Sequence, residues 1–231
     1  MSTYLVLCQN MARDIGIPGT GPDDVTSTSL SEEENAVVRH VKQADVDIQS
    51  RWFNWDFLWT EVTLTPTADV STLTSPTNLG NWNIDSFVLA KGTNSYQELE
   101  YMDWYDYNLE YKLGVITSDS PEVFSVKPDN VIDLYPTPKD TTTIGASYWK
   151  TPTEMSVDGS ESSIPSRFHK IITSRAKIYY AESEDAPEIL AGALAEFEDL
   201  LDKLEADQLS GQKSRRFSRV QNISNFTVVP Q

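Results

Sequence analysis

The chain has very few of the residues from which disulfide frameworks and metal sites are built. Its 231 residues include one cysteine, Cys8, and two histidines, His40 and His169. A single cysteine excludes an internal disulfide and a cysteine-rich zinc module. Two histidines exclude a histidine-rich metal site. We therefore expect neither a metal nor any other cofactor.

Long hydrophobic runs are also missing. No stretch approaches the roughly 18 apolar residues of a membrane-spanning helix. The first ten residues include an apolar run, but no basic residue precedes it and no small-residue cleavage site follows it. A signal peptide has the opposite order of features. These absences predict a protein that stays inside the cell and does not contact a membrane.

Positive charge is scarce, since 18 basic residues face 35 acidic ones and the formal net charge is −17. Binding to nucleic acid depends on clustered Lys and Arg side chains that neutralise phosphates, so this balance argues against a protein that holds DNA or RNA. The last 22 residues are the exception, because residues 210–231 contain four basic residues and no acidic one. Residues 1–209 consequently carry −21.

Apolar residues are plentiful, at 39% of the chain, and several follow a helical period. Stripes of this kind predict amphipathic helices over residues 3–15, 31–56, 165–183 and 186–208. The second stripe consists of Val37, Val41, Ala44, Ile48, Trp52 and Trp55. The last stripe consists of Leu190, Leu194, Phe197, Leu201 and Leu204.

Residues with known preferences for helix ends support these limits. Gly16 is placed to end the first helix, and Ser31 with Glu34 forms a capping box at the start of the second. Pro165 fits the first position of the third helix, and Asp185 is expected to cap the fourth.

Three residues with reactive side chains receive structural interpretations. Cys8 lies on the apolar stripe of the first helix, so we expect a buried, unreactive thiol. His40 lies off the apolar stripe of the second helix, which predicts a solvated side chain. His169 lies beside the third stripe and is expected to be partly exposed.

The middle of the chain changes to a period of two, which is typical of strands. Alternation predicts strands over 57–65, 82–90, 96–101 and 141–150, and a short helix over 102–113. Residues 123–136 read as a hairpin, because Pro128, Asp129 and Asn130 supply turn chemistry between two β-prone runs. Residues 66–80 are expected to form a loop.

These elements predict an α+β fold: an antiparallel helical bundle with an inserted, mostly antiparallel β module and an extended C-terminal arm. The bundle is expected to combine residues 1–56 with 160–209, around a β-rich insertion at 57–159 and a basic arm at 210–231. The aromatic residues Trp52, Trp55, Phe57 and Trp59 are expected to form the joint between bundle and insertion, since they cluster where the period changes.

Catalytic patterns give no positive signal. The Gly-x-Ser-x-Gly turn that presents a serine nucleophile is missing. An acidic cluster of Glu98, Glu100, Asp103, Asp106 and Glu110 could imitate a carboxylate pair or a calcium site. It lacks the residue order of a calcium loop, which favours a solvated acidic face. A carbohydrate-binding module, suggested by the aromatic residues, and a hydrolase with an acidic pair remain alternatives, and we expect no enzymatic activity.

The order of these elements resembles the head-to-tail adaptor, or connector, proteins of tailed bacteriophages. The similarity covers nearly the whole chain but is less clear over 66–120. Its carriers are Leu5-x-x-Cys8-x-x-Met11-Ala-Arg-Asp-Ile-Gly-Ile-Pro-Gly-Thr-Gly-Pro22, Ile48-Gln-Ser-Arg-Trp-Phe-Asn-Trp-Asp-Phe-Leu-Trp59, Val126-Lys-Pro-Asp-Asn-Val-Ile-Asp-Leu-Tyr-Pro-Thr-Pro138, Tyr148-Trp-Lys-Thr-Pro152 and Ile164-Pro-Ser-Arg-Phe-His169.

The resemblance implies a non-enzymatic virion protein in the neck, assembled in the host cytoplasm, where a ring of about twelve subunits surrounds a passage for DNA. Its implied partners are the portal protein, neighbouring adaptor subunits and a tail or neck protein below. An acidic ring would repel phosphate, so DNA would pass without specific binding. Another kind of virion assembly protein remains an alternative.

The basic tail is the candidate site for partner binding. Its positive charge is mismatched to the acidic body, and residues 223–229 are β-prone without an obvious local partner. We expect this tail to bind the portal or a neighbouring subunit through Lys213, Arg215, Arg216, Phe217, Arg219, Ile223, Phe226 and Val228.

Overall fold

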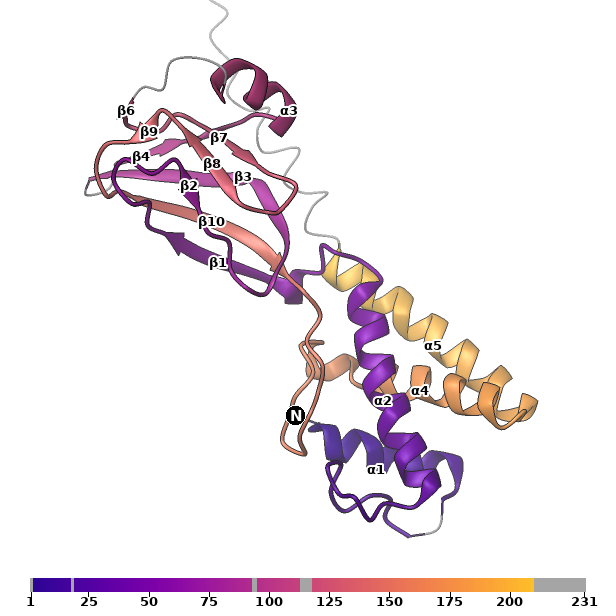
Figure 1. Ribbon diagram of the computed structural model, residues 1–231. Helices are drawn as coiled ribbons and strands as arrows, with labels where there is room; N and C mark the ends of the chain where they lie inside the picture. Colours follow the sequence, from indigo (N-terminus) through magenta and orange to yellow (C-terminus); the bar gives the residue numbers. More distant parts are fainter. Residues whose placement is uncertain (1, 18, 93–94, 113–117, 210–231) are drawn as a thin grey trace, which may run out of the picture. The chain divides into compact units, whose positions relative to one another are not determined.

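Figure 1 shows the computed structural model, which describes residues 2–17, 19–92, 95–112 and 118–209. The described residues fall into two compact units. Residues within 1–57 and 152–231 form one, called here the helical unit, and residues within 58–151 form the other, called the β unit. Among the described residues, five α-helices and sheets with mostly antiparallel pairing confirm the mixed α and β character expected from the sequence.

Four of the helices belong to the helical unit. They are α1 (Tyr4–Ile15), α2 (Glu32–Ser50), α4 (Lys170–Ser183) and α5 (Pro187–Gln208). α2 packs against α1 and α4, while α4 also packs against α1 and α5. Elements from the two ends of the chain therefore share one unit. Of the helices described, none has the length and apolar character needed to cross a membrane.

The sequence signals at the first two helices are confirmed. Gly16 ends α1 with a left-handed φ of 82°, a conformation that glycine adopts without steric cost. Ser31 Oγ accepts a hydrogen bond from the Glu34 backbone N–H at 3.2 Å. The Glu34 carboxylate accepts one from the Ser31 N–H at 2.9 Å, which completes the capping box. Cys8 is fully buried.

The predicted end of the second helix was wrong, because α2 stops at Ser50 and not near residue 56. The Arg51 N–H and the Trp55 indole Nε1–H both donate to the Ile48 carbonyl oxygen, at 3.3 and 3.1 Å. This carbonyl is therefore satisfied without a further helical turn. Trp55 is fully buried, whereas Trp52, predicted on the same stripe, is 43% exposed. The expected role of these aromatics as a joint stays a prediction.

The starts of the last two helices also differ from expectation. Pro165 precedes a short 3₁₀ turn, η3 (Ser166–Phe168), and α4 begins only at Lys170. Asp185 does not cap α5: its φ is 52°, the N-cap is Ala186, and no side chain caps the helix. The proline at the first turn of α5 is as predicted.

Both histidine predictions were wrong, since His40 is 7% exposed and His169 is 5% exposed. The His40 ring lies against Tyr179 of α4, with ring centroids 6.1 Å apart. His169 Nε2 donates a hydrogen bond to the Ile164 carbonyl at 2.9 Å. His40 is thus covered by an element from a distant part of the sequence, whereas His169 is held by a carbonyl only five residues earlier.

Three small sheets form the β unit. The first has the order β1 (Trp59–Leu64), β10 (Thr143–Lys150), β3 (Leu79–Gly92), β4 (Ser95–Glu98), and all its pairs are antiparallel. The second has the order β2 (Thr72–Leu73), β8 (Ile132–Tyr135), β7 (Val123–Val126), β5 (Glu100–Tyr101), with β5 parallel to β7. The third pairs β6 (Ser118–Asp119) with β9 (Thr137–Pro138) in parallel.

The short 3₁₀ turn η1 (Asp56–Leu58) lies where the chain passes from the helical unit into the β unit. The β unit also contains α3 (Trp104–Tyr107), which continues into the π-helical turn η2 (Asn108–Lys112). The predicted hairpin is confirmed, because β7 and β8 pair antiparallel around a turn in which Asn130 has a φ of 64°. The two larger sheets share one apolar core. Its members are Leu64, Leu73, Trp82, Phe87, Leu89, Leu99, Phe124, Ile132, Leu134, Ile144, Ala146 and Tyr148.

Two strand predictions need correction. The strand expected at 96–101 is split at Leu99, because β4 and β5 belong to different sheets. The Leu99 N–H donates to the Phe87 carbonyl of the first sheet at 3.0 Å, and the next N–H, of Glu100, donates to the Glu122 carbonyl at 2.8 Å. The strand expected from 57 begins at Trp59, and the loop expected at 66–80 contains β2 and the start of β3.

Candidate interaction surfaces

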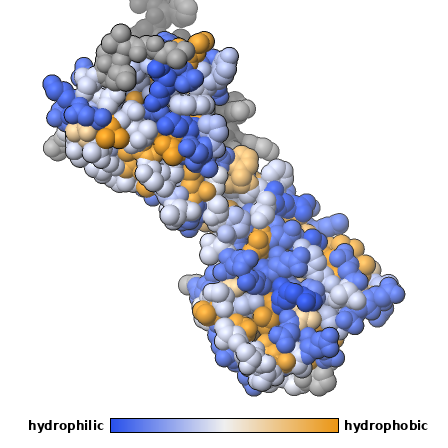
Figure 2. All heavy atoms as spheres, in the orientation of Figure 1, coloured by the Kyte–Doolittle hydropathy of each residue, from blue (hydrophilic) through white to orange (hydrophobic). Residues whose placement is uncertain are grey.

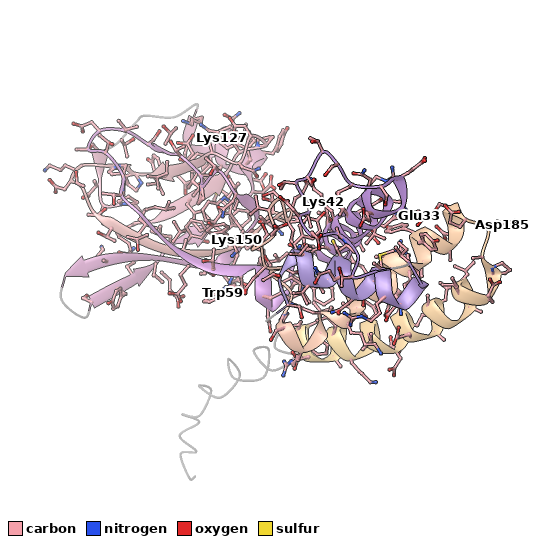
Figure 3. The ribbon with its side chains drawn as sticks, turned by 90° about the horizontal axis from the view of Figure 1, so that it is seen from below. Glu33, Lys42, Trp59, Lys127, Lys150 and Asp185 are labelled. Atoms are coloured by element: carbon pink, nitrogen blue, oxygen red, sulfur yellow. The ribbon has the colours of Figure 1, made fainter. Side chains whose placement is uncertain are left out.

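A groove follows the outward face of α2. Its volume is about 400 Å³, and it is lined by Arg39, Lys42, Gln43, Val46, Asp47, Ser50, Glu154 and Tyr179. The lining residues come from α2, from α4 and from the segment that follows β10, so the helical unit itself builds the groove. Figure 3 labels Lys42 on this helix.

Ion pairs neutralise most of the charges that line the groove. Lys42 Nζ lies 2.6 Å from the Glu154 carboxylate. Arg175 of α4 binds Asp47 at 2.8 Å and also lies over the Tyr179 ring, 4.6 Å from its centroid. Arg39 is exposed and forms no ion pair with any residue that the structure describes. The uncompensated charge of the groove is therefore positive, in a chain whose described units are both acidic.

α5 carries the opposite charge. Seven of its residues are acidic and one, Lys203, is basic. The acidic residues are Glu188, Glu196, Glu198, Asp199, Asp202, Glu205 and Asp207. Leu194, predicted on the apolar stripe, is 39% exposed, and Ala193 takes the buried position instead.

Part of this acidic charge holds the helical unit together. Glu196 interacts with Lys170, Ser174 and Lys177 of α4. Partial burial alone would raise the pKa of Glu196, but these hydrogen bonds and the nearby ammonium group of Lys177 outweigh it and lower the pKa to about 2. Glu205 accepts a hydrogen bond from Trp52 Nε1 at 2.9 Å. The exposed acids on the outward face of α5 have no comparable partner on α4 among the described residues.

A buried carboxylate, which we did not single out from the sequence, ties α2 to the chain that follows the β unit. Asp45 is fully buried and accepts hydrogen bonds from Ser162 Oγ and from Gln49 Nε2, the latter at 2.8 Å. Gln49 in turn bonds both backbone groups of Thr153, at 3.2 and 3.3 Å. Burial raises the pKa of Asp45 to about 6. The available signal was its position, since Asp45 follows Val41 by four residues on the buried face.

A second buried carboxylate lies in the β unit. Asp133 of β8 has no exposed side-chain surface and pairs with Lys112 at 2.8 Å and with Lys127 at 3.1 Å. Lys127 also lies 5.5 Å from the Trp104 ring. The two lysines therefore connect the α3–η2 segment and the hairpin turn to the second sheet. We interpret both buried carboxylates as structural, because each contacts polar or charged groups of its own unit.

The acidic cluster of the β unit is solvated, as expected: Glu98, Glu100, Asp103, Asp106 and Glu110 are all exposed. Among the residues that the structure describes, no group of three or more potential metal ligands comes together. On the face shown in Figure 2, hydrophilic side chains predominate over the helical unit, and hydrophobic ones are scattered between them.

The tail predicted to bind partners lies outside the described residues, because the structure describes the chain only up to residue 209 at this end. This applies to Lys213, Arg215, Arg216, Phe217, Arg219, Ile223, Phe226 and Val228. Their role stays a prediction. The described surfaces add the α2 groove and the outward face of α5, neither of which was singled out from the sequence.

The described surfaces are thus those of a charged, mixed α and β protein built from one discontinuous and one continuous unit. A protein-family model described as SU10 adaptor protein matches residues 2–222 of the chain. The chain belongs to this family. The expected relationship to phage head-to-tail adaptors is confirmed, and it supports a structural role in the virion and contacts with other virion proteins. A search of curated proteins found no match.

Proposed function

We propose that this protein is the head-to-tail adaptor of a tailed phage: copies of the chain form a ring between the portal and the tail, and DNA passes through it. The family match over residues 2–222 is the observation that carries the proposal. An adaptor works by binding other proteins and not by catalysis, which agrees with the absence of a recognisable nucleophile motif in the sequence.

The charge of the chain supports a passage for DNA. Residues 1–209 carry a formal −21, of which −13 belongs to the helical unit and −8 to the β unit. A ring of about twelve such chains would carry a charge on the order of −200 before counterions. Duplex DNA would be repelled along its path, so it could move without being held.

The tail at residues 210–231 is proposed as the arm that attaches each subunit to the portal or to its neighbour. Four basic residues and no acid give this tail a charge opposite to that of the body. Complementary charge speeds encounter and sets orientation. The later apolar residues could add a strand to the edge of a partner sheet, which would satisfy their backbone groups.

Truncation after Leu209 tests this proposal. We expect the shortened chain to keep the circular dichroism spectrum and melting temperature of the full chain and to lose attachment to the portal protein of the same phage. Electron microscopy of portal mixed with either chain would show whether a ring of adaptors has formed.

Two further variants separate the two halves of the tail. One changes Lys213, Arg215, Arg216 and Arg219 to Ala, and the other changes Ile223, Phe226 and Val228 to Ser. We expect the first to slow attachment in a salt-dependent way and the second to speed release. A truncated chain that still forms complete rings on the portal would remove the tail from the mechanism.

A further inference from the structure

Two helix faces of the helical unit point outward and have no partner within the described chain. On α2 the outward stripe is Arg39, Gln43, Val46 and Ser50, and it forms the floor of the groove of about 400 Å³. On α5 the face opposite the buried side chains of Phe197, Leu201 and Leu204 is formed by Gly192, Ala195, Asp199 and Asp202. Both stripes repeat every three to four residues, as the surface of one helix does.

The two faces have complementary charge. In the groove, Lys42 is paired with Glu154 and Asp47 with Arg175, which leaves Arg39 as the uncompensated group. On α5, Asp199 pairs with Lys203 of the same helix, whereas Asp202 has no ion pair with any described residue. Arg39 and Asp202 therefore each lack a counterion among the described residues, and they lie on faces that can approach one another only from different molecules.

Contact within one chain is excluded by the packing. α4 packs against both α2 and α5. α5 contacts the residues that follow α2 through Glu205, which lies 3.6 Å from Arg51 and 2.9 Å from Trp52 Nε1. The outward stripe of α5 lies on another face of that helix, so it cannot enter the groove of its own chain.

We infer that the groove along α2 receives the outward face of α5 from a second copy of the chain, with the two helices antiparallel. The inference rests on the proposed function, in that it supplies a contact between neighbouring adaptors. Arg39 and Val46 are seven residues apart, as are Asp202 and Ala195. Seven residues span about 10.5 Å of helix, so Arg39 meets Asp202 when Val46 meets Ala195.

The side chains at this contact fit a close approach of two helices. Gly192 and Ala195 add little volume, and a Cβ built on Gly192 has no neighbouring heavy atom within 4 Å. Small residues at the crossing allow interaxial distances near the lower end of about 8–10 Å. Antiparallel packing also places opposite ends of the two helix dipoles together.

A contact of this kind is heterologous, because each copy uses α2 toward one neighbour and α5 toward the other. Head-to-tail contacts generate a ring when the rotation closes. The groove and α5 would thus define the two sides of each subunit in an adaptor ring, independently of the basic tail.

Cysteine cross-linking tests the contact directly. Cys8 is the chain's only cysteine and is fully buried, so introduced thiols report the designed pair. The double variant Val46→Cys with Ala195→Cys retains all charges of both faces. After oxidation on the portal, we expect a covalent ladder from dimers to closed rings, and no ladder from either single variant.

A charge exchange tests the proposed ion pair. We expect Arg39→Glu to reduce the number of complete rings about tenfold, because it puts two acids face to face. Asp202→Arg should reduce it by a similar factor, because it puts two arginines face to face. The double variant should restore ring formation to within about twofold of the wild type. Lys91→Glu in the β unit makes the same change in net charge and should have no effect.

The outcomes distinguish the contact from the function. Rings that form normally but give no ladder would overturn the α2–α5 contact and leave the adaptor proposal intact. Dimers from Val46→Cys alone would show that two grooves face one another, which would also overturn it. If Arg39→Glu and Lys91→Glu lost equal numbers of complete rings, and the double variant restored none, net charge alone would explain the loss. That result would overturn the proposed ion pair. A wild-type chain that forms no ring on the portal would instead contradict the proposed function.

Discussion

The contacts inside the helical unit differ in kind from those inside the β unit. In the helical unit, polar groups connect segments far apart in sequence: Lys177 pairs with Asp14 at 3.1 Å, and Arg175 with Asp47 at 2.8 Å. In the β unit, one continuous segment closes over an aromatic core, where the Phe87 and Phe124 ring centroids lie 4.0 Å apart. Directional contacts are well suited to a unit assembled from two separate pieces, because they specify which pieces belong together.

The largest effect is expected at Trp55, which belongs to the helical unit but is buried like a residue of the aromatic core. Trp55→Ala removes a fully buried side chain, its stacking on Phe57 with ring centroids 5.3 Å apart, and its bond to the Ile48 carbonyl. We expect a loss of about 3–5 kcal/mol in the free energy of unfolding. Urea titration followed by circular dichroism would measure it.

Trp52→Ala is the matched control, three residues away. Trp52 is 43% exposed and keeps one hydrogen bond to Glu205, so its loss should cost about 1 kcal/mol. Equal losses of unfolding free energy in the two variants would show that the burial of Trp55 is not the source of its stabilising effect. Two separate unfolding transitions, of which Trp55→Ala lowers only one, would show that the two units are also independent domains.

The second effect concerns Asp45, the buried acid of the helical unit, and it depends on pH. The pKa of Asp45 is raised from 3.8 to about 6 by burial, so between these values the folded chain binds a proton that the unfolded chain releases. Asp45 therefore makes the folded chain less stable as pH rises from about 4 to about 6, by at most about 3 kcal/mol. Asp45→Asn should remove this part of the pH dependence, as measured by thermal melting across that range.

Glu33→Gln is the control for the loss of one carboxylate, since Glu33 is exposed in the first turn of the same helix. This variant should retain the decrease in stability between about pH 4 and about pH 6. If Asp45→Asn also retained it, the dependence would come from other groups, and burial of Asp45 would not be its cause.

The smallest effect is expected at the start of α2. Ser31→Ala removes one half of the capping box, the bond between Ser31 Oγ and the Glu34 N–H. We expect a loss of about 1 kcal/mol, confined to the helical unit. Ser50→Ala, at the exposed far end of the same helix, should leave the melting temperature nearly unchanged. A similar drop in both variants would argue against the cap as the cause.

Signals from neighbouring residues predicted most of the helices and strands. The features that the sequence did not predict depend on contacts between elements far apart in the chain. The capping box at Ser31, the glycine stop at Gly16 and the hairpin around Asn130 depend on a few adjacent residues, and all three are confirmed. The burial of His40 depends on Tyr179, which lies 139 residues later in the sequence. The helical period places His40 three residues after Val37 and four before Ala44, at the edge of the buried stripe, but it could not identify the residue that covers it.

The candidate surfaces were less predictable for the same reason. Arg39 has no special sequence context. That it lacks a counterion in the described part of the chain emerges only when Lys42 and Asp47 are seen to pair with residues from other elements. The split at Leu99 is similar. The alternation of residues 96–101 does not reveal that a carbonyl of the first sheet and one just before β7 of the second accept consecutive N–H groups. The basic tail was visible from composition alone.

The register of β1 with β10 has a consequence for the order of folding. Trp59 pairs with Trp149, so the chain enters and leaves the β unit at neighbouring positions. Before this unit folds, its residues, 58–151, form a long flexible loop between the two pieces of the helical unit. Loop closure costs about 0.6 kcal/mol for each doubling of length, and folding shortens this loop by four to five doublings. The β unit would thereby favour assembly of the helical unit by about 2–3 kcal/mol through chain entropy alone, without any contact between the two.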